Sequence, residues 1–345
     1  MWLMVAFSFV VLTHPMFEAD KPMEWMTQQR SMNEEFIATY SKAGFDSLNV
    51  RFVGSYDTPG CARGVYVSGD YAYVADGEAG LRVIDVSDPQ NPVEVGYYDT
   101  PGYAVDVYIS GGYAYVAAGY AGLRVIDVND PSNPVEVGHY DTPGCTYDVY
   151  VSGGYAYVAD EDSGLQVIDI SDPQNPVEVG YYNTPGWALG VYVSGGYAYV
   201  ADDWAGLRVI DISDPSNPEE VGYYDTPDYA WDVYVSGDYA YVAAWYAGLR
   251  VIDVSDPTSP EEVGYYDTPG SALDVYVSGD YAYVADYDAR SLRVTDMSDP
   301  ENPVEVGYYD TPDYAYGVYV SGGYTYVASC WAGLQIYHFQ PIRRN

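Results

Sequence analysis

Most of this chain is one unit of about 42 residues, repeated with little change. The spacing between copies is 42 residues five times and then 43. A period of this length is typical of solenoids, propellers and other repeat arrays, and it constrains the fold more than any other feature. The aspartate of the recurring Tyr-Asp-Thr-Pro corner marks the copies at Asp57, Asp99, Asp141, Asp225, Asp267 and Asp310, with Asn183 in the fourth position.

Each unit contains four short runs with strand character and no helical pattern. In the second copy they cover residues 105–110, 113–117, 123–128 and 135–140. Ser-Gly-Gly or Ser-Gly-Asp joins the first two as a tight hairpin, where glycine supplies a positive φ. A proline-rich (S/N)DPxxP turn joins the last two and ends the strand. The third run is almost wholly apolar and the fourth alternates, so the unit grades from buried to exposed, like a propeller blade.

The two ends of the array complement each other. The last copy stops after its third strand, at residues 333–339, while residues 49–57 match the missing fourth strand. An open solenoid would need polar caps at its ends and not a shared repeat. We therefore predict an all-β fold, a seven-bladed β-propeller with four antiparallel strands per blade. Its last blade is closed by the N-terminal strand, with residues 50–56 hydrogen-bonded alongside residues 334–339.

The repeat motif identifies a family resemblance. YAYVA followed by GLRVIDVSDPxNP resembles the LVIVD-repeat family of β-propellers, at residues 81–92 and at the equivalent places of five further copies. The sequence departs from the motif at residues 258–259, 295–297 and 337–338. The resemblance implies an exported or cell-surface propeller. It implies no specific enzymatic activity and supplies no catalytic residues.

The segment before the array differs in composition. Residues 1–20 begin with an apolar run of 13 residues, too short to span a bilayer and similar in length to a signal-peptide core, but without a basic leader. A mis-assigned start codon or a short hydrophobic flank are the alternatives. Residues 21–48 are predicted to be a helical linker, because apolar residues between 22 and 42 have helix-like spacing. The propeller domain is then predicted to cover residues 49–340.

The net charge of −38 narrows the set of partners. A surface this acidic repels phosphate backbones and anionic lipid. We therefore expect no nucleic-acid partner and no insertion of the propeller into a membrane. The charge is also compatible with a high-salt habitat, which the sequence alone does not establish.

Comparison of the copies with one another indicates where a binding site would lie. In a propeller, the loop that enters each blade and the loop between its second and third strands lie on one face, which we call the variable face because the copies differ there. Loops on a rigid scaffold commonly carry the binding function, and aromatic side chains give large contact area at small entropy cost. The alternative is that these rings fill the mouth of the channel. The candidate binding residues are Trp187, Trp204, Trp231, Trp245, Trp331, Tyr103, Tyr120, Tyr229, Tyr246 and Tyr316.

Aspartates recur at one position of the inner strand near this face. Asp106, Asp148, Asp232 and Asp274 occupy it, and glycine replaces them in the other three copies. A partial carboxylate ring at the channel mouth would suit a hard cation such as calcium, which takes several oxygen ligands. The alternative, that each aspartate binds backbone amides of its own corner, is favoured. No dedicated metal-binding loop is present, and no other cofactor is expected.

Two of the three cysteines fall in loops that ring closure would bring together. Cys61 follows the strand contributed by the N-terminus, and Cys330 lies in the variable loop of the seventh blade. We predict a disulfide between them in an oxidising compartment, with their Cα atoms no more than about 7 Å apart. The alternative is that both are unpaired small residues.

The residues give little support for an enzyme. His14, His139 and His338 are the only histidines, and none lies in a variable loop, so no catalytic triad can be assembled. Carboxylates are too numerous for a glycosidase-like pair to be recognised. We predict a non-enzymatic, extracellular or surface-exposed module that binds a protein, peptide or glycan. A carbohydrate-active hydrolase and a structural surface-layer module are the alternatives. A deep pocket with two facing carboxyls, one of raised pKa, would favour the hydrolase.

Overall fold

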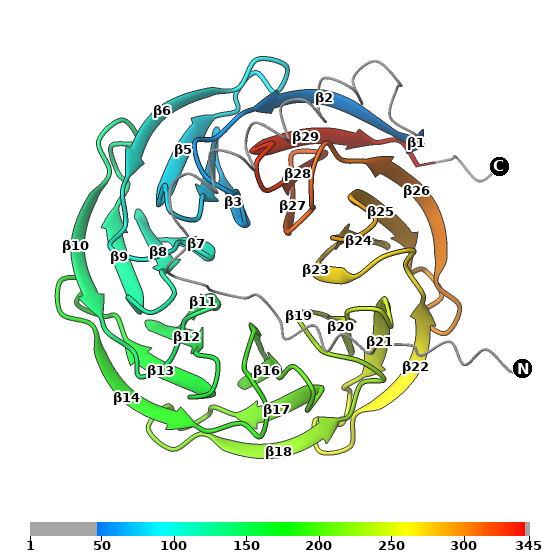
Figure 1. Ribbon diagram of the computed structural model, residues 1–345. Coiled ribbons are helices and arrows are strands. Elements are labelled where there is room, and N and C mark those ends of the chain that lie inside the picture. The colour runs from blue at the N-terminus through cyan, green and yellow to red at the C-terminus, as the bar shows by residue number, and fades with distance from the viewer. Residues whose placement is uncertain (1–46, 342–345) are drawn as a thin grey trace, which may run out of the picture.

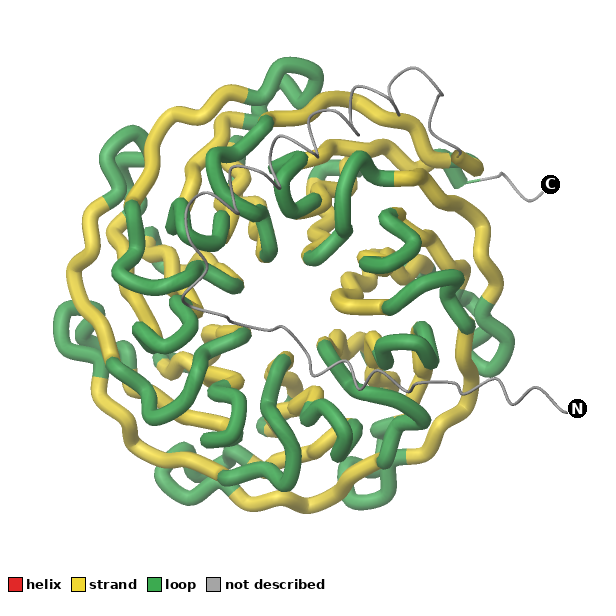
Figure 2. Tube along the Cα trace, in the orientation of Figure 1, coloured by secondary structure: helices red, strands yellow, loops and turns green. Residues whose placement is uncertain are grey.

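The computed structural model describes residues 47–341, and these form a closed ring of seven blades around a central channel, six with four strands and one with a fifth (Figure 1). The outermost strands follow the rim of the ring, and loops lie over the face turned to the viewer in Figure 2. No helix occurs within the described range, and so none there is long and apolar enough to cross a bilayer. The predicted signal and most of the helical linker lie outside these residues.

Every blade repeats the same antiparallel order from the channel outward. The innermost strands are β3 (Gly64–Ser68), β7 (Asp106–Ser110), β11 (Asp148–Ser152), β15 (Gly190–Ser194), β19 (Asp232–Ser236), β23 (Ala272–Ser278) and β27 (Gly317–Ser321). The second strands are β4 (Tyr71–Ala75), β8 (Tyr113–Ala117), β12 (Tyr155–Ala159), β16 (Tyr197–Ala201), β20 (Tyr239–Ala243), β24 (Tyr281–Asp286) and β28 (Tyr324–Ala328).

The third and outermost strands complete each sheet. The third strands are β5 (Leu81–Asp85), β9 (Leu123–Asp127), β13 (Leu165–Asp169), β17 (Leu207–Asp211), β21 (Leu249–Asp253), β25 (Ser291–Asp296) and β29 (Leu334–Phe339). The outermost strands are β6 (Val93–Tyr98), β10 (Val135–Tyr140), β14 (Val177–Tyr182), β18 (Glu219–Tyr224), β22 (Glu261–Tyr266), β26 (Val304–Asp310) and β2 (Val50–Tyr56).

Closure of the ring has the predicted form. Strand β2, from the N-terminal end, pairs antiparallel with β29, from the C-terminal end, in a register that runs from Val50–Phe339 to Tyr56–Leu334. In Figure 1 the blue strand lies directly outside the red one. The linker prediction needs one change, because residues 47 and 48 form strand β1 (Ser47–Leu48), which pairs with β26 as a fifth strand of the sixth blade.

The hydrophobic core is a set of layers between neighbouring blades. In one layer, Leu207 and Val209 of β17 pack against Val233 and Ile252 of the next blade. Each blade has a neighbour on both faces, so its inner three strands must be apolar on both sides, and the third strand therefore reads as a nearly continuous apolar run. Equivalent layers recur around the ring.

Backbone contacts also link blade to blade on both faces. On the variable face, residues of the loop entering one blade form isolated bridges with the preceding blade, as between Gly119 and Thr146. On the opposite face, a Cβ on Gly138 would lie 2.2 Å from the carbonyl oxygen of Pro173 in the next blade's turn. The outer strand needs glycine there because the two backbones approach so closely, and this explains why that turn hardly varies between copies.

Candidate functional site

Seven of the ten candidate binding residues form two clusters on the variable face. Trp187 and Trp204 form the first, with ring centroids 5.5 Å apart in an edge-to-face arrangement. Both come from the fourth blade, and they are 40% and 53% exposed. Such exposure is far more than a channel-filling role requires. Tyr120 and Tyr246 are still more exposed, at 67% and 65%, and Tyr229 is also exposed.

The second cluster is a continuous run of rings, which we call the aromatic crescent. Trp231 stacks on Trp245 at 5.1 Å, and Trp245 on Tyr287 at 6.1 Å. The ring centroids of Tyr287 and Tyr316 are 5.0 Å apart. The guanidinium carbon of Arg63 lies over the Tyr316 ring, 4.4 Å from its centroid. The residues of the crescent are Trp231, Trp245, Tyr246, Tyr287, Tyr314, Tyr316, Arg63 and Tyr103.

Arg63 joins the two ends of the chain within the crescent. Its guanidinium lies over both Tyr316 and Tyr103, and its Nε donates a hydrogen bond of 3.3 Å to the Tyr103 hydroxyl. The two phenol rings raise the pKa of Arg63 against the lowering effect of burial, so the side chain stays cationic. Arg63, Tyr287 and Tyr314 were missed as site residues, although all three lie in the loops whose variation the sequence makes visible.

The remaining candidate, Trp331, lies partly buried in the loop of the seventh blade. Its backbone amide donates to a carboxylate oxygen of Asp313 at 3.2 Å. Trp231 and Tyr316 differ from the others because they immediately precede inner strands and line the channel itself. The ten predicted aromatics are therefore brought to one face, but they divide between an outer surface and the channel mouth.

The channel contains a cavity of about 350 Å³, lined from the residues that precede the inner strands to the tyrosines within them. One residue from each blade, the residue just before or at the start of the inner strand, forms its mouth, which we call the collar. Three collar residues are aromatic, three are aliphatic and one is basic. They are Arg63, Val105, Tyr147, Leu189, Trp231, Leu273 and Tyr316.

The four inner-strand aspartates lie just below the collar and form two pairs. Asp106 and Asp148 share a hydrogen bond between their carboxyl groups, and so do Asp232 and Asp274. Burial raises the pKa of Asp106 and of Asp274 well above its usual range, and raises that of Asp148 to about 6. Each pair therefore retains a shared proton near neutral pH, as two carboxyls in contact must.

These carboxyls also tie adjacent inner strands together. The backbone amide of Val191 donates to Asp148 at 2.7 Å, that of Val275 to Asp232 at 3.1 Å, and that of Val318 to Asp274 at 2.6 Å. The aspartates hold backbone amides, as the favoured alternative stated. The amide of Val149, next to Asp148 in its own strand, donates to it at 2.6 Å, and the three amides named above add bonds from the next blade.

The single cation ring is not what the structure contains. Glycines at positions 64, 190 and 317 separate the aspartates into two pairs. Across residues 47–341, no group of three or more histidine, cysteine, aspartate or glutamate side chains is placed to hold a metal ion. The donor set therefore does not fit calcium, which needs several converging oxygens.

A closed ring of seven tyrosines forms the floor of the cavity. One tyrosine from each inner strand contributes, and neighbouring ring centroids are 4.6 to 4.9 Å apart around the full circle. Burial and the neighbouring phenol groups raise the pKa of Tyr108, Tyr192, Tyr276 and Tyr319 above its usual range, so these hydroxyl groups keep their protons. This tyrosine ring comprises Tyr66, Tyr108, Tyr150, Tyr192, Tyr234, Tyr276 and Tyr319. Sequence reasoning missed it, although an identical residue in all seven inner strands must converge on the axis of a closed ring.

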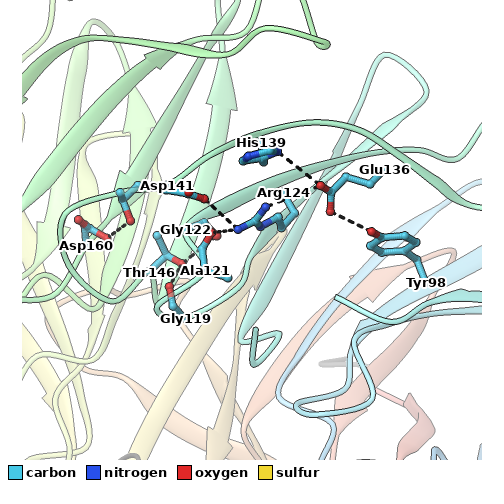
Figure 3. A network of polar contacts seen from close by, with 11 residues as sticks. Tyr98, Gly119, Ala121, Gly122, Arg124, Glu136, His139, Asp141, Thr146 and Asp160 are labelled. Atoms are coloured by element: carbon cyan, nitrogen blue, oxygen red, sulfur yellow. Dashed lines mark hydrogen bonds and ion pairs between the residues drawn. The ribbon is translucent and has the colours of Figure 1, made fainter. Parts of the chain in front are cut away.

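Beneath the variable face, a buried arginine network supports the loops. Nη2 of Arg124 donates to Asp141 at 2.9 Å and also to the Ala121 carbonyl oxygen, and Glu136 lies 3.7 Å from Nη1 (Figure 3). The same arrangement recurs at Arg82, Arg208 and Arg250. In the third blade glutamine replaces the arginine at 166, and the partner at 183 is asparagine, so both members of the pair change together.

The predicted disulfide is present on this face. Cys61 is bonded to Cys330, with Cα atoms 4.0 Å apart, and the amide of Ala62 donates to the Cys330 carbonyl at 3.0 Å. The bond joins the loop of the seventh blade to the segment that enters the first. Cys145 is a free, buried cysteine.

Comparisons with known proteins agree with this architecture. A family model described as "LVIVD repeat" matches residues 59–100, 101–142, 143–184, 185–226, 227–268, 269–311 and 312–337. No curated protein matches the chain.

Two similar solved structures show the same fold at low identity. The β-propeller domain of Myceliophteria thermophila Cps50 (Swd1) has a TM-score of 0.69 at 13% identity, covering 84% of this chain and 100% of that one. The computationally designed Ika8 protein has a TM-score of 0.64 at 8% identity, covering 83% and 99%. At such identities the likeness concerns the fold alone.

Proposed function

The chain belongs to the LVIVD repeat family, and from that premise we propose that it is a recognition module. In this proposal its propeller, exported or exposed at a cell surface, binds a protein, peptide or glycan through the variable face and catalyses no reaction. The observation that carries the proposal is the pair Trp187–Trp204, two large aromatic side chains exposed side by side on a rigid scaffold. Contiguous exposed aromatic surface marks interaction sites.

The disulfide and the net charge support the proposed extracellular location and restrict the classes of partner. A disulfide that joins the ends of the ring is expected to persist in an oxidising compartment. A net charge of −38 disfavours nucleic acid and anionic membranes as partners. The exposure of Trp187, Trp204 and Tyr246 also argues against a purely structural role, because side chains that only filled the channel mouth would be buried.

The proposal is tested on glycan and peptide arrays. The wild type is compared with Trp187→Ala/Trp204→Ala and with the control Tyr97→Ala/Tyr181→Ala, which removes rings of similar exposure, 54% and 56%, from the outer strands. We expect the tryptophan variant to lose at least tenfold in binding and the control to bind as the wild type does. A wild type that binds nothing on either array would remove the support for recognition.

One observation favours a second function, a hydrolase acting on carbohydrate. Two carboxyl pairs with raised pKa values lie in a cavity on the variable face, which is the arrangement that would favour an enzyme. We rank it second because the partners in each pair bond to each other and to backbone amides. Glycosidase carboxyls instead lie more than about 5 Å apart, with the scissile bond between them. Hydrolysis of 4-nitrophenyl glycosides that is abolished by Asp106→Asn/Asp148→Asn would reverse this ranking.

A further inference from the structure

We propose that the cavity in the channel binds a single sugar unit at the end of a glycan chain, beneath the aromatic surface of the variable face. This inference rests on the proposed recognition function and names its ligand class. The cavity, of about 350 Å³, is at the small end of the range for ligand pockets. Because the cavity is small and is enclosed by residues of all seven inner strands, it accommodates one sugar ring and not a longer stretch of chain.

The upper part of the cavity matches the apolar face of a sugar ring. Trp231 and Tyr316 present aromatic surface at the mouth, Leu273 lies between them around the collar, and Leu189 lies on the other side of Trp231. The stack of Trp231 on Trp245 fixes the orientation of the indole, so little entropy is lost when a guest packs against it. Leu189 is 5% exposed and packs with Val105, so the wall is pre-formed.

The lower part of the cavity matches hydroxyl groups. Each aspartate pair presents both kinds of partner, since one carboxyl retains a proton and the other accepts. Below them, the tyrosine ring contributes phenol hydroxyl groups, each of which can donate and accept. Sugar hydroxyls donate and accept at once, so they are matched by a wall that does both.

Hydrogen-bonding capacity distinguishes this guest from a basic side chain. A lysine or arginine inserted into the channel would need acceptors alone, whereas the carboxyl of each pair that keeps its proton is a donor. The guanidinium of Arg63, held over Tyr316 and Tyr103 at the collar, adds further donors. Each pair still carries one negative charge, so the basic probes in the following test decide between a polyol and a cation.

The test separates the channel from the outer surface. Saturation-transfer NMR and calorimetry would measure binding of free glucose, galactose, mannose, fucose, N-acetylglucosamine and N-acetylneuraminic acid, with N-acetyl-lysine amide and putrescine as basic probes. The wild type is expected to bind at least one sugar and neither basic probe. Leu189→Trp, which fills the cavity, should weaken sugar binding at least tenfold, and Trp231→Ala should weaken it several-fold. Val93→Trp, the matched addition of an indole to an exposed outer strand, should bind as the wild type.

The outcomes distinguish this inference from the proposed function. If Leu189→Trp binds sugar as the wild type does, or if only the basic probes bind, the channel site is refuted while array recognition through Trp187 and Trp204 still stands. Binding of peptides but of no sugar refutes the inference in the same way. If the Leu189→Trp variant does not fold, the sugar affinity of Trp231→Ala decides whether the channel is the binding site, because that substitution enlarges the cavity and does not overfill it.

Discussion

Cys61 and Cys330 are separated by 269 positions in the sequence and joined by a disulfide where the ring closes. The bond fixes the segment that follows β2 to the loop that precedes β29, and these two strands form the pairing that closes the seventh blade. Two interactions therefore close the ring: the Cys61–Cys330 disulfide on the variable face and the backbone hydrogen bonds between β2 and β29. Everything on the variable face depends on this closure, because the aromatic crescent crosses the same seam between Tyr316 and Arg63.

Removing this disulfide should destabilise the closed ring. We expect Cys61→Ser/Cys330→Ser to lose roughly 2–4 kcal/mol, since the bond closes a very long loop in the unfolded chain. The amides of β2 and β29 should lose protection from hydrogen exchange before those of other blades. Thermal unfolding and hydrogen exchange measure this, with Cys145→Ser as a control. Equal protection of β2 in the variant and the wild type would contradict the expectation.

A second disulfide should form where the same geometry recurs without its second cysteine. Gly119 occupies the position of Cys330 in the second blade, and a Cβ added to it would lie 3.8 Å from Sγ of Cys145. Its φ of 56° lies in the region that Cys330 itself adopts, at 31°. Oxidised Gly119→Cys should therefore contain no free thiol, measured by thiol titration and non-reducing mass spectrometry. The control Gly119→Cys/Cys145→Ser should keep one, and two free thiols in the single variant would disprove the pairing.

Arg124, beneath the loops of the variable face, should stabilise the fold mainly through its buried hydrogen bonds and less through its ion pair with Asp141. Arg124→Gln is expected to cost about 1–2 kcal/mol, because buried hydrogen bonds from a charged group are lost. Asp141→Asn should cost about 0.5 kcal/mol, since the Asp141 side chain is 70% exposed and its ion pair is screened. A double-mutant cycle should then give a coupling below about 1 kcal/mol. Gln166 already fills this position in the third blade, where its Nε2 donates to Ser163 at 2.6 Å. A much larger coupling would mean that the exposed pair dominates.

Stability should fall as pH rises from about 4 to about 7. Burial raises the pKa of Asp76 to about 7 and the pKa of Asp202 to about 6, despite bonds from Thr58 and Thr184 that lower them. A carboxyl with a raised pKa binds its proton more tightly in the folded state. Its stabilisation is complete below its ordinary pKa, near 4, and is lost as pH rises from there to its folded-state pKa, about 6 for Asp202 and about 7 for Asp76.

Substitution isolates this pH effect. Asp202→Asn should reduce the slope of unfolding free energy against pH by up to about 1.4 kcal/mol per pH unit within that window. Asp256→Asn is the control, because bonds from Thr258 lower the pKa of Asp256 and keep it ionised from pH 5 to 8. Chemical denaturation at a series of pH values measures both. An unchanged slope in Asp202→Asn would show that this carboxyl does not titrate there.

Much of the fold was predictable because it depends on short-range chemistry repeated seven times. The glycine and proline turns, the apolar third strands and the alternating fourth strands specify a blade wherever they occur. The half-repeats at 49–57 and 333–339 specify closure, and with closure comes the approach of Cys61 to Cys330. Even the tyrosine ring was implicit in an identical residue at one position of every inner strand.

The sequence by itself determined the blade, its sevenfold repetition, the closing strand and the face on which the copies differ, because each follows from local patterns and their period. Only the tertiary structure decided which side chains meet. It paired the aspartates in place of one carboxylate ring, exposed Trp187 and Trp204, turned Trp231 into the channel, and set Arg63 over Tyr316. Those outcomes depend on how neighbouring blades are rotated and how side chains pack across them, and the order of residues within one repeat does not contain that information.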